Sequence, residues 1–235
     1  MSRVVVACFA SVVALVVTLT HADLQEALRW YEMGQYTRMY DELKGPAEEG
    51  NVTAARTLGW MLEWGIQTRG RQGLEARPEE AARWYRKAAD AGDKTAIEAM
   101  GVLYATGHGV PRDPEESIRW FSKVREVDGP MKDVAGYGTL AEQREIAAWF
   151  MALGVAVRRV VRFPRDAIRG NNFGKVILLF DAATGTVTVR ESDSVTLLRD
   201  EGERAGRNAL EHTPAPPAAV RHKATATIEL IYQFD

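Results

Sequence analysis

The chain has 235 residues, of which 46% are apolar and 26% charged, and its formal net charge is −2. These values are ordinary for a soluble globular protein, and the near-neutral charge excludes a global basic field that would recruit nucleic acid. The length is sufficient for one large domain or two small ones.

The N-terminal segment departs from this average, because an almost uninterrupted apolar run extends over the 16 residues from Val4 to Leu19. As a helix the run would span about 24 Å, which is short for a bilayer core of about 30 Å. The small residue Ala22 follows at a position that suits signal peptidase. We therefore predict an export signal over residues 1–22 and a periplasmic protein. An uncleaved inner-membrane anchor and a buried N-terminal helix are the alternatives.

The only cysteine, Cys8, lies inside this segment. Cleavage after Ala22 would leave a chain without any thiol, which could form no disulfide and offer no thiolate for catalysis or metal binding.

Two stretches of the chain align without gaps. The ten residues from Pro78, PEEAARWYRK, match the ten from Pro114, PEESIRWFSK, at an offset of 36. A second match has an offset of 42 and pairs Gly50, Ala54, Gly59 and Gly65 with Gly92, Ala96, Gly101 and Gly107. Periods in this range are typical of stacked supersecondary units.

Each unit is predicted to be a pair of helices. Glu79 to Ala91 is the first helix, with an apolar residue at every third or fourth position, and Gly92 ends it. Lys94 to Thr106 is the second, in which Gly101 allows a neighbouring helix to approach closely. The first helix of the next unit runs from Pro114 to Val127.

These residues resemble the Sel-one-like repeat, a relative of the tetratricopeptide repeat, over roughly Leu24 to Val127. The matching positions are Ala82, Trp84, Tyr85, Lys87, Ala88, Ala89, Gly92, Ala96, Gly101, Tyr104, Gly107, Gly109, Val110 and Asp113. The resemblance implies a curved α-solenoid over residues 23–127 that assembles proteins and has no catalytic activity of its own.

A linker is predicted over residues 128–139, followed by a long helix from Leu140 to Arg162 that Phe163-Pro164 ends. After Pro164 the spacing of apolar residues changes from the helical period to the alternation that is typical of strands. Strands are predicted at Phe173 to Phe180, Thr186 to Glu191 and Lys223 to Phe234, with a hairpin turn after the first and a helix from Val195 to Leu210 before the last.

This order of elements resembles the C-terminal domain of TonB over about Val155 to Asp235, with Phe163-Pro164, Gly174-Lys175-Val176, Phe180-Asp181 and Gly185-Thr186-Val187 as the matching residues. The predicted fold class is therefore an all-α solenoid followed by a small α+β domain with an antiparallel sheet, over residues 140–235. Such domains accept an extended peptide from an outer-membrane transporter by adding a strand. The resemblance implies that peptide-binding residues are Arg162, Phe163, Pro164, Thr225, Thr227, Glu229, Ile231 and Gln233.

The helix before the last strand lacks the tryptophan that usually closes it in this family, and no Pro-Lys spacer precedes the domain. A structural or cell-wall-associated periplasmic adaptor without a transport role is therefore the alternative function, and a sheet edge covered by the protein itself is the alternative structure.

No catalytic site, metal or cofactor is predicted. The four histidines form no i, i+4 pair, and Gly107-x-Gly109 lacks the context of a dinucleotide fingerprint. Glu79-Glu80 and Glu115-Glu116 suit the first turn of a helix. The aromatic pairs Trp84-Tyr85 and Trp120-Phe121 are expected in the core. Trp60 and Trp64, at i and i+4, are the candidates for a binding groove of the repeats.

Overall fold

The computed structural model describes residues 4–7, 27, 29–66, 73–124, 138–160, 174–181, 184–192, 196–213, 218 and 225–232. The chain divides into two compact units. The repeat unit comprises Val16–Arg125, and the sheet unit combines Met1–Leu15 with Glu126–Asp235.

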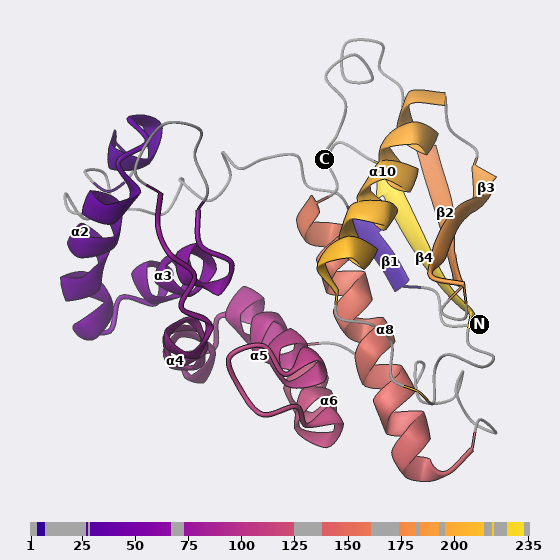
Figure 1. The fold of residues 1–235 in the computed structure, drawn as a ribbon, viewed down its shortest axis with the longest axis horizontal. Helices are drawn as coiled ribbons and strands as arrows, with labels where there is room; N and C mark the ends of the chain where they lie inside the picture. The colour runs from indigo at the N-terminus through magenta and orange to yellow at the C-terminus, as the bar shows by residue number, and fades with distance from the viewer. Residues whose placement is uncertain are drawn as a thin grey trace. The chain divides into compact units, whose positions relative to one another are not determined.

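The repeat unit is built of consecutive helices, each packed against the next (Figure 1). They are α2 (Tyr36–Glu48), α3 (Val52–Glu63), α4 (Pro78–Asp90), α5 (Lys94–Thr106) and α6 (Pro114–Ser122). The predicted helices agree with α4 and α5 to within one residue at either end. The last predicted helix is too long, since α6 ends at Ser122 and not at Val127.

Side-chain caps fix where three of these helices begin. Asn51, Asp93 and Asp113 precede α3, α5 and α6, and each accepts a hydrogen bond from a backbone N–H of the first turn at 2.8–2.9 Å. Gly50 and Gly92 immediately precede two of the caps and have positive φ, which only glycine adopts without strain. The turns between helices are therefore encoded locally.

Two glycines allow the helices of successive repeats to pack closely. A Cβ atom built on Gly59 would lie 2.7 Å from the ring of Tyr85, and one on Gly101 would lie 2.8 Å from the ring of Phe121. Tyr85, Phe121 and Trp120 are buried, as the sequence predicts, whereas Trp84 is only half-buried. The close approach predicted at Gly101 is confirmed, and Gly59 repeats it one unit earlier.

The sheet unit contains α8 (Leu140–Val160), α10 (Thr196–His212) and strands β1 (Val4–Ala7), β2 (Gly174–Asp181), β3 (Thr186–Ser192) and β4 (Thr225–Tyr232). Thr139 and Glu142 form a capping box at the start of α8: Thr139 donates from its backbone N–H to Oε2 of Glu142 at 2.6 Å, and the Glu142 N–H donates back to the threonine hydroxyl at 3.3 Å. Gly206 lets α10 lie close to the sheet, because a Cβ there would fall 2.8 Å from Cγ1 of Val187.

The four strands form one sheet in the order β1-β4-β2-β3 (Figure 1). β2 pairs with β3 and with β4 in antiparallel fashion, and eight residue pairs join β2 to β4, from Gly174 opposite Tyr232 to Asp181 opposite Thr225. α10 packs against β2 and β3, and α8 packs against α10.

The predicted antiparallel pairing is confirmed for β2, β3 and β4, but a fourth strand that was not predicted, β1, pairs with β4 in parallel. Val4 lies opposite Ile228 and Ala7 opposite Ile231. These N-terminal residues belong to the segment predicted as an export signal. The alternative of a buried N-terminal helix does not hold for residues 4–7. Among the helices that the structure describes, none is both long and apolar enough to cross a membrane.

Candidate functional site

Two groups of aromatic rings lie on the repeat unit, one of Tyr36, Tyr31 and Trp60 and one of Trp64 and His108, and we call them together the aromatic strip. The rings of Tyr31 and Tyr36 meet edge-on with centroids 5.7 Å apart, and those of Tyr31 and Trp60 are 6.4 Å apart. Trp60 and Trp64 are four residues apart at the end of α3, and Trp64 stacks on His108 at 4.1 Å. The strip therefore joins the segment before α2 to α3 and to the turn after α5.

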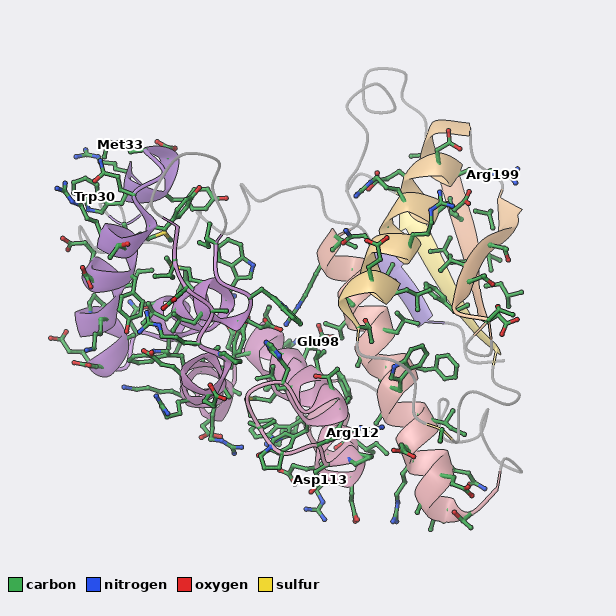
Figure 2. The ribbon with its side chains drawn as sticks, in the orientation of Figure 1. Trp30, Met33, Glu98, Arg112, Asp113 and Arg199 are labelled. Carbon is green, nitrogen blue, oxygen red and sulfur yellow. The ribbon has the colours of Figure 1, made fainter. Side chains whose placement is uncertain are left out.

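The two tryptophans of the strip are unusually accessible for residues of their size. Each is 50% exposed, whereas Tyr31, Tyr36 and His108 are half-buried. Met33 is 47% exposed and lies at the same end of the repeat unit as Trp30 (Figure 2). Large apolar side chains that gather on an exposed surface are typical of sites where proteins contact partners.

The turn that carries His108 has a backbone conformation that requires its two neighbouring glycines. Gly107 and Gly109 both have positive φ, and a Cβ on Gly109 would fall 2.1 Å from the carbonyl oxygen of Pro78. Nε2 of His108 is 2.7 Å from the backbone oxygen of Glu63. Because a carbonyl can only accept, His108 donates here from a protonated Nε2. The imidazole is thereby fixed against Trp64.

A buried hydrogen bond anchors the end of α3 beneath the strip. The hydroxyl of Tyr85 donates to Oε2 of Glu63 at 2.8 Å, and the two residues are only 2% exposed. Arg56 on the same helix forms an ion pair of 3.1 Å with Asp93, the cap of α5. Both interactions cross between neighbouring helices, so the position of α3 and its tryptophans is set by the following repeat.

A second polar cluster joins α2 to α4. Glu80 accepts hydrogen bonds from the Tyr40 hydroxyl at 2.7 Å, from Arg77 at 2.8 Å and from the Trp84 indole at 3.2 Å. Burial raises the pKa of Glu80, but the hydrogen bonds from Tyr40 and Trp84 and the charge of Arg77 outweigh it and leave the pKa below its ordinary value. Burial and the hydrogen bond to Glu80 raise the pKa of Tyr40. Glu80 is thus an ionised structural carboxylate at neutral pH, as its place in the first turn of α4 suggests.

The predicted groove residues Trp60 and Trp64 are exposed, and the structure adds Tyr31, Tyr36 and His108 to them. The stacking of His108 on Trp64 was not predicted. The glycines on either side of His108 were the available signal that the backbone there has a specific conformation. Tyr31 and Tyr36 carried no comparable signal.

The predicted peptide-binding residues lie in the other unit. Thr225, Thr227, Glu229 and Ile231 belong to β4, which lies between β1 and β2. Arg162, Phe163, Pro164 and Gln233 lie outside the described residues, as does most of the predicted linker. In the described part of the chain, no group of three or more histidine, cysteine, aspartate or glutamate side chains could hold a metal ion.

Comparison with known families supports the interpretation of the helices. The Sel1 repeat model matches residues 20–34, 53–93 and 95–123. The matched ranges cover α3, α4, α5 and α6, which are Sel1 repeats, whereas α2 lies between the first two ranges. Tyr31, Trp60, Trp64 and His108 of the aromatic strip fall within the matched ranges, and Tyr36 does not.

A solved structure described as a Sel1 repeat protein from Oxalobacter formigenes is 28% identical to this chain, with a TM-score of 0.38. The match covers 57% of this chain and 55% of that one, so it spans about half the length of that protein. No curated protein matches the chain.

Sel1 repeats typically mediate protein–protein interactions, and proteins built from them are in general scaffolds without catalytic activity. They suggest a scaffold for protein–protein interaction here as well. None of the matched ranges extends into α8, α10 or β2–β4 of the sheet unit.

Proposed function

We propose that this protein is an exported envelope scaffold that binds protein or peptide partners through the aromatic strip of its Sel1 repeats. The observation that carries the proposal is the half-exposure of Trp60 and Trp64, the two largest side chains of the strip. Tryptophan is among the residues most enriched at binding hot spots, where truncation to alanine often costs about 2 kcal/mol or more of binding free energy.

The strip is also organised before any partner arrives. Trp64 is stacked on a histidine that the turn fixes, and Trp60 packs beside Tyr31. Side chains that are already ordered lose little rotamer freedom on binding, for which the cost is about 0.5–1.5 kcal/mol per side chain. Exposed but immobilised tryptophans are therefore suited to contact another protein.

A paired capture experiment tests this proposal. Immobilised wild-type protein and the variant Trp60→Ala, Trp64→Ala are exposed to the same envelope extract, and the bound proteins are quantified by mass spectrometry. We expect specific partners to be depleted at least tenfold on the variant, since the loss of about 2 kcal/mol at one hot-spot tryptophan already weakens binding by about 30-fold.

Leu140→Ala is the matched control, because Leu140 is a large apolar residue with 55% exposure that lies at the start of α8 and outside the strip. Equal recovery of every partner by wild type and the double variant would reject the aromatic strip as the binding surface.

Strand addition at β4 is the second candidate function, and it belongs to the sheet unit. The order hairpin, helix, strand of β2, β3, α10 and β4 agrees with the resemblance to the TonB C-terminal domain, and it supports this candidate. Each main-chain hydrogen bond to an added strand contributes about 0.5–1.5 kcal/mol net. A handful of them gives only a few kcal/mol, so side chains would supply the specificity.

Proline substitution tests strand addition. Consecutive residues of a strand direct their N–H groups to opposite sides. Proline lacks this N–H, so only one of the two variants Thr227→Pro and Ile228→Pro removes a backbone hydrogen bond to β2. The other variant keeps the β2–β4 pairing and should lose peptide binding. Unchanged binding in the variant that remains folded would exclude addition at this strand.

Two partner classes fit an envelope scaffold with these parts, namely outer-membrane transporters and cell-wall or division proteins. The capture experiment distinguishes them, because outer-membrane transporters among the proteins captured by the wild type support a transport role, and wall or division proteins support the adaptor alternative. Periplasmic localisation is tested by the intact mass of the chain after fractionation. A mass that begins at Asp23 in the soluble periplasm supports it, whereas a chain that retains Val4 to Leu19 in the inner membrane supports the anchor.

A further inference from the structure

On the side away from β2, strand β4 pairs with another strand of the same chain, β1. Residues Val4–Ala7 lie in parallel register with Ile228–Ile231, so the main-chain groups of β4 on that side are paired by the chain's own N-terminal segment (Figure 1). We call this side of β4 the β4 edge.

β4 stays in the sheet without β1, because its other side pairs with β2. Eight residue pairs join β4 to β2, whereas four join it to β1. Parallel neighbours are usually linked by a crossover connection of a dozen or more residues, but β1 and β4 come from opposite ends of the described chain. β1 can therefore leave without breaking a turn or the β2–β4 ladder.

β3 is an outer strand of the sheet, and without β1 the other outer strand would be β4. β3 has the sequence Thr-Val-Thr-Val-Arg-Glu-Ser, which includes two adjacent charged residues, whereas the part of β4 that β1 covers is Ile-Glu-Leu-Ile. An apolar unpaired edge is a template for pairing with another chain, and proteins cover such edges. β1, with three valines in succession, has the β-branched composition that suits an added strand.

The residues that cover the edge are also the beginning of the predicted export signal. We infer that β1 is a removable occupant of the β4 edge, and that a chain from which residues 1–22 have been cut accepts in its place an extended, β-branched peptide running parallel to β4. This inference rests on the proposed strand addition. It specifies the site and the direction of the added peptide, and it names β1 as the segment that blocks the site before cutting.

The test uses the full chain with a protease recognition site placed between Ala22 and Asp23. The folded protein is compared before cutting and after cutting and removal of the released fragment. The probe is a fluorescent synthetic peptide with the sequence of residues 2–9 and serine in place of Cys8. We expect the cut protein to bind the probe saturably and the uncut protein to bind at least about tenfold more weakly, because its own β1 competes from within the chain.

Hydrogen exchange gives an independent readout. Amides of Ile228–Ile231 that face β1 should exchange at least about tenfold faster after cutting and regain protection when the probe is added, while those that face β2 should change little. Equal exchange in the cut and uncut proteins would overturn the assignment of β1 as the occupant.

Two probe variants distinguish strand pairing from unspecific adhesion of valines. N-methylation at Val5 and at Val6 should act oppositely, one abolishing binding and the other leaving it unchanged, since adjacent residues of a strand face opposite sides. Equal effects of the two methyl groups would overturn strand pairing.

The outcomes also separate this inference from the function on which it rests. Equal probe binding by the cut and uncut proteins would be consistent with strand addition, but it would show that β1 does not block the site. Faster exchange at β4 without any probe binding would confirm that β1 leaves but reject strand addition, and with it the inferred acceptor site.

Discussion

Gly101 on α5 lies against the ring of Phe121 on α6, so closely that a Cβ atom on the glycine would fall 2.8 Å from the ring carbons. Gly59 and Tyr85 repeat the same relationship between α3 and α4, with a distance of 2.7 Å. The repeat is therefore a packing unit as well as a sequence pattern, in which a glycine of one helix receives an aromatic ring of the next.

Gly101→Ala should destabilise the repeat unit by about 1–3 kcal/mol, because the added methyl group overpacks the contact with Phe121 by more than the gain in helix propensity. The free energy of unfolding in urea measures the effect. A double-mutant cycle with Phe121→Leu is the control, since a smaller side chain should relieve the overlap and reduce the cost of the alanine. The same cost in both backgrounds would contradict the packing explanation.

Tyr85→Phe should cost about 1–3 kcal/mol of unfolding free energy, because it removes a hydroxyl that donates to the buried carboxylate of Glu63 and leaves that group with one donor fewer. Chemical denaturation of the two proteins provides the measurement. Since Glu63 ends α3, the variant should also weaken partner capture by the aromatic strip. A variant as stable as wild type would show that the hydrogen bond contributes nothing net.

The stability of the repeat unit should fall in acid partly through Glu80. The pKa of Glu80 in the folded protein is lower than the ordinary 4.5, so ionised Glu80 stabilises the fold above that value. This contribution is lost as the pH falls from 4.5 through the lower folded-state pKa. Unfolding free energies of wild type and Glu80→Gln, measured from about pH 6 to about pH 3, should converge in acid. A constant difference across this range would exclude the titration of Glu80 as the cause.

His108→Ala should weaken binding at the aromatic strip by roughly 2- to 12-fold, which corresponds to about 0.5–1.5 kcal/mol for a stacked aromatic pair. The stack with Trp64 is lost while the exposed face of the indole remains. His108→Phe, which keeps a ring at the position, is the matched comparison and should retain most of the affinity for a captured partner. If both variants bind like wild type, the stack does not organise the surface.

The repeats could be predicted from the sequence because their signals are local. Offsets of 36 and 42 place the glycines and aromatic residues in register, and the caps and positive-φ glycines lie beside the helix ends that they determine. The end of α6 was placed too late, because no glycine or proline stands between Lys123 and Val127 to mark it. Trp84 was expected in the core like Tyr85, but its indole reaches outward to Glu80.

Strand β1 could not be predicted, for two physical reasons. An apolar run of valines and alanines has no period that distinguishes a signal segment from a strand. In addition, its partner β4 lies more than 200 residues away in the chain, so no turn residue marks the pairing. The aromatic strip was found only in part for a similar reason, since Tyr31 contacts Trp60 and His108 contacts Trp64 through tertiary packing and not through spacing along one helix.

Site-specific photo-crosslinking at residue 60 tests the central claim most directly. A photoreactive phenylalanine analogue replaces Trp60 in the full chain, and in a second protein it replaces Arg83, an exposed residue of α4 outside the strip. After irradiation in living cells, we expect discrete adducts with another protein from position 60 and none of the same adducts from position 83. The same adducts from both positions, or no adduct from position 60, would contradict a scaffold that binds its partners through the aromatic strip.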